Sequence, residues 1–427
     1  MWPGIRDFLR VYGLVALLVG LAVWLAWGFV ADPPPRRLVL AAGAPDGTYW
    51  RTAERYRTAF AREGIVLELL QTEGAVDNLA RLEAGTADLA FVQGGIARPE
   101  GHAGVVAIGG IFHEAVWLFH DSRLAVKRIG ELRGLRVAIG HEGSGTRALA
   151  LSLLAASGVA ESVATLRSLG GDAAAEALAT GQVDAALFVA ANPTAAIQRL
   201  LRTEGVALAD FSARADAYVT AFPFLTAVRL PAGGISLSED LPPDTTVMLA
   251  PAAQLAARED IHPQIVALLM GILAETHARG ELLTPLGSFP SALLVDFPLH
   301  PDAARWYRSG PGYLQRVAPF WVAVTIERMW VLVIPLLTVG LPLLRFAPPL
   351  WRWQGERRIY RWYQELRAVE RSLAAPDNAD RAGIAARLDL LDHKLARLSV
   401  PLAHTGKLYA LRMHIDLVRA RLRPPTG

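Results

Sequence analysis

Two short segments decide the fold of this chain: Gly85-Thr86-Ala87-Asp88-Leu89-Ala90 and Gly181-Gln182-Val183-Asp184-Ala185-Ala186. Each reads Gly-x-x-Asp followed by apolar residues, which predicts a turn that leads into a buried strand. Each also follows the same order of predicted elements, namely strand, glycine-rich turn, helix, strand and helix. The sequence therefore predicts two similar α/β lobes, each with a mainly parallel sheet covered by helices.

The individual elements follow from the alternation of apolar, β-rich runs with helical patterns. Ligands of open α/β sheets bind outside the carboxyl ends of the strands, so we expect a ligand cleft between the two lobes. The predicted strands are Leu38–Ala42, Val66–Leu70, Ala87–Val92, Arg136–Ile139, Thr165–Leu169 and Ala185–Val189, and the predicted helices are Tyr49–Arg62, Ala75–Ala84, Thr146–Ser157 and Ala173–Thr180.

An uncharged segment of the length of a membrane span lies near the N-terminus, from Val11 to Val30. At 1.5 Å per residue it covers roughly 30 Å, the thickness of a bilayer core. A cleavable signal peptide is the alternative. Its apolar region is normally shorter, and bulky Phe29 stands where cleavage after Ala31 needs a small residue. We therefore expect residues 1–31 to be an uncleaved anchor.

A second predicted span covers residues 321–346, with an uncharged core from Met329 to Leu344. Five arginines follow this core between Arg345 and Arg361, among tryptophans, which is a positive-inside pattern with an aromatic belt. The alternative is that both segments are buried core helices. The arginines favour two spans in the bacterial inner membrane, with both termini cytoplasmic and residues 32–320 forming an extracytoplasmic body.

Charge and composition narrow the classes of function. The body from Ala31 to Ala318 has 24 Lys+Arg and 30 Asp+Glu, whereas Arg345 to Gly427 has 16 and 8, so the basic balance belongs to the C-terminal segment. Membrane topology explains that asymmetry better than nucleic-acid binding does. The chain has no cysteine, which excludes disulfides, thiolate metal sites and a cysteine nucleophile.

The cytoplasmic segment, residues 347–427, is predicted to be helical. Gln354–Leu373 reads as a helix, Pro376-Asp377-Asn378 breaks the pattern, and two amphipathic helices follow with apolar steps of three and four residues. Their apolar positions run from Ile384 to Leu398 and from Leu408 to Leu422. A small self-packed bundle is the first expectation, and a role in oligomerisation or signalling is the alternative.

The first candidate ligand-binding residues lie in two turns that each join a strand to a helix. Gly43, Thr48 and Tyr49 come from the turn after the first strand, and Ser144-Gly145-Thr146 from the matching turn of the second lobe. Backbone amides and the positive end of a helix dipole converge in such turns, which favours a carboxylate or phosphate. The alternatives are a plain tight turn for the first and an ordinary helix cap for the second.

Further candidates end the neighbouring strands: Thr72 and Gln93 in the first lobe, Phe188 and Asn192 in the second. The histidines show no metal-ligand spacing. Gly143-Ser144-Gly145 lacks the Gly-x-Ser-x-Gly spacing of a nucleophile elbow, and no paired catalytic carboxylates are evident. The sequence therefore predicts a binding protein without catalytic residues, metal or cofactor.

These motifs together resemble the TAXI family of solute-binding proteins, the receptors of one subclass of TRAP transporters. The resemblance rests on Thr72–Leu79 running on to Gly85–Gln93, on Arg136–Gly140 followed by Gly143–Thr146, and on Gly181–Ala190. It covers about Leu38 to Leu283. It implies a type II periplasmic-binding-protein fold that captures dicarboxylates or acidic amino acids and passes them to an ion-driven permease.

The resemblance also implies segments that cross between the lobes, near Trp117–Asp121 and Tyr218–Val228. The chain departs from the family pattern in its first turn, and in Glu73-Gly74-Ala75, where the family has Gly-Gly-Ser. A carboxylate there opposes a dianionic ligand unless a cation such as Arg147 or Arg51 pairs with it. The leading hypothesis is a membrane-anchored capture subunit of a TRAP-type system; the alternative is a receptor that signals through its cytoplasmic helices.

Overall fold

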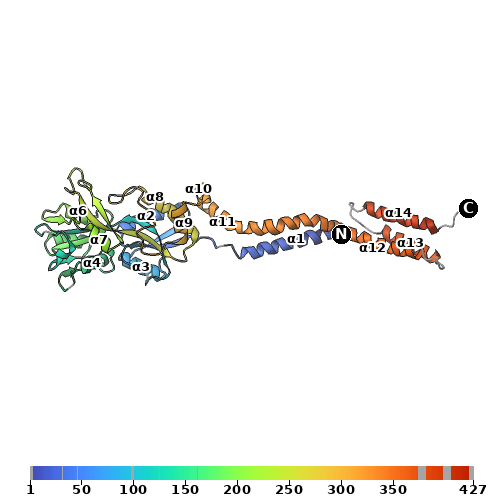
Figure 1. The fold of residues 1–427 in the computed structure, drawn as a ribbon, viewed down its shortest axis with the longest axis horizontal. Helices are drawn as coiled ribbons and strands as arrows, with labels where there is room; N and C mark the ends of the chain where they lie inside the picture. The colour runs from blue at the N-terminus through green and yellow to red at the C-terminus, as the bar shows by residue number, and fades with distance from the viewer. Residues whose placement is uncertain are drawn as a thin grey trace. The chain divides into compact units, whose positions relative to one another are not determined.

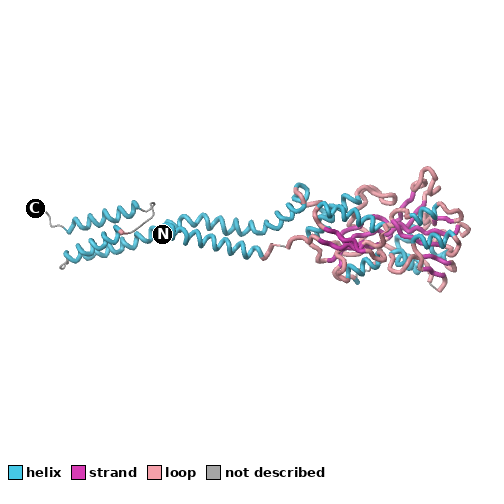
Figure 2. The backbone as a smooth tube through the Cα atoms, turned by 180° about the vertical axis from the view of Figure 1, so that it is seen from behind, coloured by secondary structure: helices cyan, strands magenta, loops and turns pink. Residues whose placement is uncertain are grey.

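The computed structural model describes residues 3–30, 32–45, 47–97, 101–124, 126–160, 162–373, 381–397 and 405–422. The chain divides into two compact units, Pro33–Val324 and a helical unit made of Met1–Asp32 with Thr325–Gly427. Figure 2 shows strands only in the first of these units, where helices surround them. The unit Pro33–Val324 is itself built as two lobes.

Lobe 1 is a sheet whose strands β1, β2 and β3 are parallel, with β11 antiparallel to both β3 and β4. Its strand β3 is buried along its whole length because α2 and α8 pack on one face of the sheet and α3 packs on the other. The elements of lobe 1 are β1 (Arg37–Ala41), α2 (Thr48–Arg62), β2 (Val66–Leu70), α3 (Ala75–Glu83), β3 (Leu89–Gln93), β4 (Val105–His113), the second half of β11 (Thr246–Arg258), α8 (Pro263–His277), α9 (Pro301–Ser309) and α10 (Tyr313–Val317).

Lobe 2 repeats this plan around a sheet with the order β7-β6-β8-β5-β9. The strands β6, β7 and β8 are parallel and β5 is antiparallel to β8. The labels in Figure 1 place α4, α6 and α7 around this sheet. The elements of lobe 2 are β5 (Ala115–Asp121), the 3-10 helix η2 (Ile129–Leu132), β6 (Arg136–Ala138), α4 (Gly145–Ala156), β7 (Thr165–Arg167), α5 (Gly171–Ala179), β8 (Ala185–Ala190), α6 (Ala195–Leu201), β9 (Val206–Leu208), α7 (Ala215–Ala221) and β10 (Leu225–Leu230).

The two Gly-x-x-Asp segments have the same structural role in both lobes. Asp88 accepts a hydrogen bond from the backbone N–H of Val39 at 2.8 Å, and Asp184 accepts one from the backbone N–H of Arg136 at 2.8 Å. Each aspartate therefore holds the start of the neighbouring parallel strand. The predicted strand–helix order of both lobes is confirmed, as is the two-lobed α/β architecture with two sheets.

The crossing segments lie elsewhere than expected. Trp117–Asp121 lies inside β5, and Tyr218–Val228 forms the end of α7 and most of β10, so both belong to lobe 2. The chain crosses instead at Glu114, between β4 and β5, and at Pro251 within β11. The prediction was wrong because β11 serves both lobes: Thr246–Pro251 pairs with β10, and the residues after it pair with β3 and β4.

The C-terminal end of this unit is fixed to lobe 1. The indole N–H of Trp321 donates to the carbonyl of Glu63 at 2.6 Å, and the guanidinium of Arg36 lies 5.2 Å from the Trp321 ring centroid. Ala323 and Val324 are buried beside it. These residues begin α11 (Phe320–Pro335), so the helix that leaves the lobes starts on lobe 1.

The helical unit contains one helix that is long and apolar enough to cross a membrane, Phe320–Pro349, among the residues that the structure describes. Only 6% of its apolar window is buried, so it is not a core helix. A π-helical turn, η3 (Leu336–Gly340), follows Pro335, because proline removes a backbone donor and disturbs the regular ladder. The N-terminal helix α1 (Pro3–Trp27) contains a shorter apolar stretch, Tyr12–Trp27.

The C-terminal helices form a small bundle with its own core. Leu366 and Val369 of α12 (Leu341–Leu373) pack against apolar side chains of α13 (Arg381–Ala396) and α14 (Thr405–Leu422), and Figure 1 draws the three side by side. The self-packed bundle is thus what the structure has, with α12 as its third helix. The predicted break at 376–378 and the position Leu398 lie outside the described residues. The core residues are Leu366, Val369, Ile384, Leu388, Leu391, Leu395, Leu411, Ile415 and Val418.

Candidate functional site

The turn before α2 and the starts of α3 and α4 meet between the lobes. A Cβ built on Gly43, in the turn before α2, would lie 3.7 Å from the Tyr49 ring and 4.0 Å from the Cα of Gly74, which precedes α3. A Cβ on Gly74 would in turn lie 3.3 Å from the Cα of Ser144, which precedes α4 in the other lobe. Neither α2 nor α3 has a side-chain cap, so their first amides are available to a ligand.

The two lobes contact each other where Gln93 of lobe 1 meets the start of α4. The side-chain amide of Gln93 donates to the backbone carbonyl of Gly145 at 3.3 Å, and Gln93 is only 3% exposed. A Cβ on Gly145 would overlap the Gln93 side-chain oxygen and lie 3.3 Å from the Cβ of Ala75. Glycine is therefore required at position 145 for the lobes to come this close.

Thr72 supports the first turn of lobe 1. Its hydroxyl accepts a hydrogen bond from the backbone N–H of Gly43 at 3.1 Å and donates to the side-chain oxygen of Asn78. The Asn78 amide donates to the carbonyl of Phe91 at 2.8 Å. Thr72 thus lies at the predicted place, and its hydroxyl is already engaged in holding the turn.

Ser144 likewise has a structural partner at its predicted place. Its hydroxyl accepts from the backbone N–H of Arg147 at 3.2 Å and donates to the carbonyl of His141 at 2.7 Å. This makes it the N-cap of α4. Thr146 is the second residue of that helix and is half-buried, as is Thr48 at the start of α2. The structure therefore brings Gly43, Tyr49, Thr72, Gln93 and Ser144-Gly145 to one junction, and Thr48 and Thr146 are the chain neighbours of Tyr49 and Gly145.

The two candidates from the end of β8 differ from that group. Phe188 is 6% exposed and packs against Phe119 in the core of lobe 2, with ring centroids 6.1 Å apart. Asn192 is half-buried, and its side-chain amide donates to the carboxylate of Glu281 at 2.9 Å. Successive residues of a strand point to opposite faces of a sheet, and the side chain of Phe188 lies on the face that packs into the core.

A residue that the sequence analysis did not select, Glu114, lies at the crossing between the lobes. The hydroxyl of Tyr49 donates to its carboxylate at 2.7 Å, and the Tyr49 ring stacks on Phe91 with centroids 5.2 Å apart. Burial raises the pKa of Glu114 to about 7. A sequence signal existed, because Glu114 is the one acidic residue inside the apolar run 105–120.

Both acidic and basic side chains lie around the junction. Glu73 is exposed, and its carboxylate lies 4.0 Å from the His141 ring. Arg147, expected as a counter-charge, donates to the hydroxyl of Ser168 at 2.9 Å. Arg51 lies 3.5 Å from the Thr48 hydroxyl. Within the described ranges, no group of three or more histidines and acidic residues is arranged to hold a metal ion.

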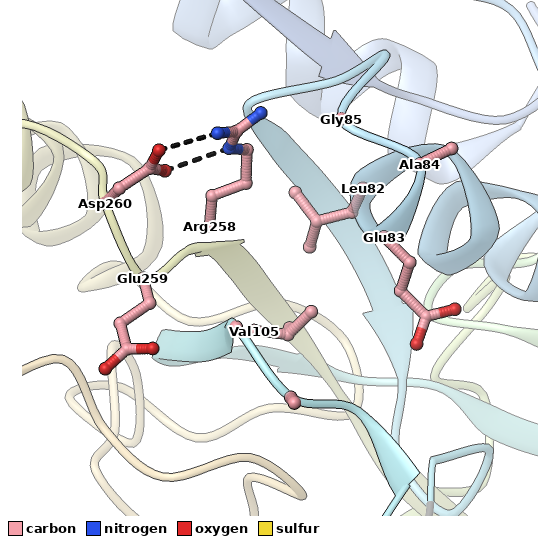
Figure 3. Close-up of a pocket in the computed structure, with 10 residues that line it drawn as sticks. Leu82, Glu83, Ala84, Gly85, Val105, Arg258, Glu259 and Asp260 are labelled. Carbon is pink, nitrogen blue, oxygen red and sulfur yellow. Dashed lines mark hydrogen bonds and ion pairs between the residues drawn. The ribbon is translucent and has the colours of Figure 1, made fainter.

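A pocket of about 470 Å³ lies at the other end of the lobe 1 strands (Figure 3). Arg258, which ends β11, makes two hydrogen bonds to the Asp260 carboxylate at 2.9 and 2.6 Å. Val105 begins β4 and Gly85 precedes β3, so the pocket is at the amino ends of the parallel strands. It is separate from the junction between the lobes, because that junction lies at their carboxyl ends.

A family model described as the NMT1-like family matches residues 40–309, more than half of the chain. The chain belongs to the NMT1-like family. The match spans both lobes and every residue of the junction described above. This family is of the periplasmic-binding-protein type, and the two α/β lobes agree with that assignment.

Solved structures similar to this NMT1-like chain include three solute-binding proteins. The periplasmic aliphatic sulphonate binding protein SsuA from Escherichia coli is 16% identical, with 76% of this chain and 94% of that chain covered and a TM-score of 0.37. The alkanesulfonate-binding protein SsuA from Xanthomonas axonopodis pv. citri, bound to MOPS, is 18% identical over 57% and 74% of the chains, with a TM-score of 0.37. The amino acid ABC transporter substrate-binding protein AbpA from Streptococcus pneumoniae, bound to L-arginine, is 19% identical over 58% and 91%, also at 0.37. Likeness at this level says nothing about what this chain binds.

Proposed function

We propose that this protein is a membrane-anchored solute-binding protein that captures a small anionic organic solute between its lobes, without converting it, for TRAP-type uptake. The observation that carries the proposal is that the turn before α2 and the starts of α3 and α4 meet, from two lobes, at Gly43, Gly74 and Ser144. Unpaired helix amides and aligned dipoles favour a carboxylate, phosphate or sulfonate. A ligand held by both lobes favours their closed arrangement, because it adds contacts that the open arrangement lacks.

We propose that two helices cross the membrane and anchor the protein. The helix Phe320–Pro349 is one, and α1 with its apolar stretch Tyr12–Trp27 is the other. The arginines that follow Leu344 favour a cytoplasmic location for the C-terminal bundle. The lobes are then extracytoplasmic, and a permease in the same membrane is the expected partner.

A thermal-shift screen of the full chain in detergent tests the capture function. Dicarboxylates, acidic amino acids and sulfonates are added one at a time, and the melting temperature is recorded. A ligand at 100 times its Kd should stabilise the protein by about 2.7 kcal/mol. If no acid in the panel changes the melting temperature, the capture of a small anion is wrong. Unchanged probe after prolonged incubation is expected, since we propose no chemistry.

A second function is favoured by one feature, the three-helix bundle that follows the candidate span and has its own core. A receptor would use such a bundle to report that the cleft is occupied. Removing residues 354–427 should then leave the thermal shift intact and abolish a cytoplasmic response. Loss of uptake, with no change in any cytoplasmic output, would leave only the transport role.

A further inference from the structure

Glu114 lies at the edge of lobe 1 where the proposed ligand cleft opens. It follows His113, the last residue of β4, and precedes Ala115, the first residue of β5. Phe112 of β4 and Gln93 of β3 lie at the same level of the sheet, because both residues pair with Ala253 of β11. Glu114 therefore stands two residues beyond the level of Gln93, at the carboxyl ends of the lobe 1 strands. This is where α/β sheets hold ligands.

The carboxylate of Glu114 is buried with few partners. The residue is 5% exposed, and its side chain has one hydrogen bond, from the hydroxyl of Tyr49. Its backbone N–H donates to the carbonyl of Pro251 at 2.9 Å, which fixes the crossing itself. Within the described ranges the Glu114 carboxylate has no ion pair. An ionised carboxylate has about four acceptor sites, so most of its capacity is unused.

The groups around Glu114 do not supply a positive charge. Tyr49 of α2 is a neutral donor. His113 turns away and packs against Phe289, with ring centroids 5.0 Å apart. Burial lowers the pKa of His113, so it is neutral at neutral pH. Among the residues that the structure describes, no cationic group is therefore paired with the buried carboxylate.

A purely structural role does not need this charge. If Glu114 served only to orient Tyr49, the neutral side-chain oxygen of a glutamine would accept the same hydrogen bond. A buried carboxylate costs stability unless a cation pairs with it. Such a cost is characteristic of binding sites, where the ligand supplies the missing partner.

We propose that Glu114 pairs with a positively charged nitrogen of the captured solute, so that the solute carries an ammonium or guanidinium group as well as its acid. This inference rests on the proposed function. The acid group faces the helix starts at Gly43, Gly74 and Ser144, and the cationic group faces Glu114 and Tyr49. Among the acids that the helix starts accept, Glu114 selects those with a cationic nitrogen.

Matched probe pairs test this selection in the full chain at pH 8. Each pair differs only in the nitrogen: L-glutamate against glutarate, taurine against ethanesulfonate, and β-alanine against propionate. For the wild type, the amine member of the pair that binds should bind roughly 10- to 100-fold more tightly. In Glu114→Gln that preference should fall to about threefold or less. The matched control is Asp296→Asn, a half-buried carboxyl that already accepts from the Gly95 N–H at 2.8 Å, and it should keep the preference.

The outcomes separate the two proposals. Equal or tighter binding of the amine-free member, or an unchanged preference in Glu114→Gln, overturns the role of Glu114 and leaves solute capture standing. If neither member of any pair changes the melting temperature, capture of a small acid fails and the role of Glu114 fails with it.

A second measurement needs no ligand. Because the raised pKa of Glu114 makes its ionisation costly in the folded protein, Glu114→Gln should melt at a higher temperature than the wild type at pH 8. Near pH 5 the difference should be much smaller, because the folded protein holds this group neutral, and it should disappear below about pH 4, where the unfolded chain holds it neutral too. A lower melting temperature of Glu114→Gln at both pH values would show that the carboxylate is structural, and would overturn the inference.

Discussion

Lobe 1 and lobe 2 share one strand–helix plan, yet they are connected to the rest of the chain in different ways. Lobe 1 receives the N-terminal linker at Arg36 and Arg37, and it holds the start of α11 through Trp321. Lobe 2 begins at Ala115 and ends before Pro251, so it joins the chain only through the two crossings. A change in the angle between the lobes therefore moves lobe 2 while both linkers remain fixed to lobe 1.

This difference bears on the two proposed functions. A receptor that signals by separating its two linkers needs them on parts that move apart. Here both are attached to lobe 1, so closure of lobe 2 leaves the distance between them unchanged.

The largest effect is expected from Gly145→Val, which fills the contact between Gln93 and the start of α4. The added methyl groups would meet Gln93 and Ala75 of lobe 1. The Kd of the best probe in the thermal-shift screen should rise by roughly 100-fold, about 2.7 kcal/mol. Gly271→Val is the control, since a Cβ at Gly271 meets nothing within 4 Å. Unchanged binding by Gly145→Val would mean that the lobes need not come this close to hold a ligand.

Acid should destabilise lobe 1 through His277. The Tyr56 hydroxyl and the His277 ring lie 2.7 Å apart, and burial lowers the pKa of His277 to about 4. Because the folded state favours the neutral ring, His277 contributes to the free energy of unfolding. This contribution is at most about 3 kcal/mol; it is complete above about pH 6.5 and is lost as the pH falls toward 4. Urea unfolding of His277→Gln should show a shallower loss over that range. His141→Gln, on the surface of lobe 2, should keep the wild-type slope.

The two Gly-x-x-Asp segments should differ in their contribution to stability. Asp184 accepts from the Arg136 backbone and also pairs with its guanidinium at 2.6 Å. Among the described residues, the Asp88 carboxylate accepts from the Val39 backbone and forms no ion pair at such a short distance. Asp184→Asn should cost about 2 kcal/mol and Asp88→Asn about 1 kcal/mol. The hydrogen bond from Arg136 lowers the pKa of Asp184. The stability that Asp184 contributes beyond that of Asp88 is therefore present above about pH 4 and is lost in stronger acid. Equal costs at pH 7 would show that the ion pair adds nothing.

The smallest change is expected between the two linkers. Since the chain has no cysteine, spin labels attach only at engineered positions. Labels at Pro35→Cys and Val317→Cys should keep their distance to within about 1 Å when a binding probe is added, whereas Ala84→Cys and Ser152→Cys, one in each lobe, should approach by several ångströms. Motion between the linkers would instead favour the receptor.

Much of the fold was predictable because it depends on local patterns. Alternating apolar strands and amphipathic helices placed β1, α2, β2, α3 and β3, and their counterparts in lobe 2, close to their observed limits. The junction was predictable in part: glycine turns and polar strand ends led to Gly43, Thr72, Gln93 and Gly145. The TAXI assignment, the anionic ligand and the N-terminal span remain predictions that the family match does not decide.

What the sequence by itself determined is the repeated α/β unit and the helical C-terminal segment, since both follow from periodicity and from turn residues at fixed offsets. Only the tertiary structure decided which residues serve both lobes. β11 is shared because its two halves find different partner strands, and no local pattern encodes that choice. Glu114 matters for the same reason. A single charge in an apolar run becomes a candidate ligand partner only when strands far apart in the sequence bring it beside Tyr49, at the edge where the two lobes meet.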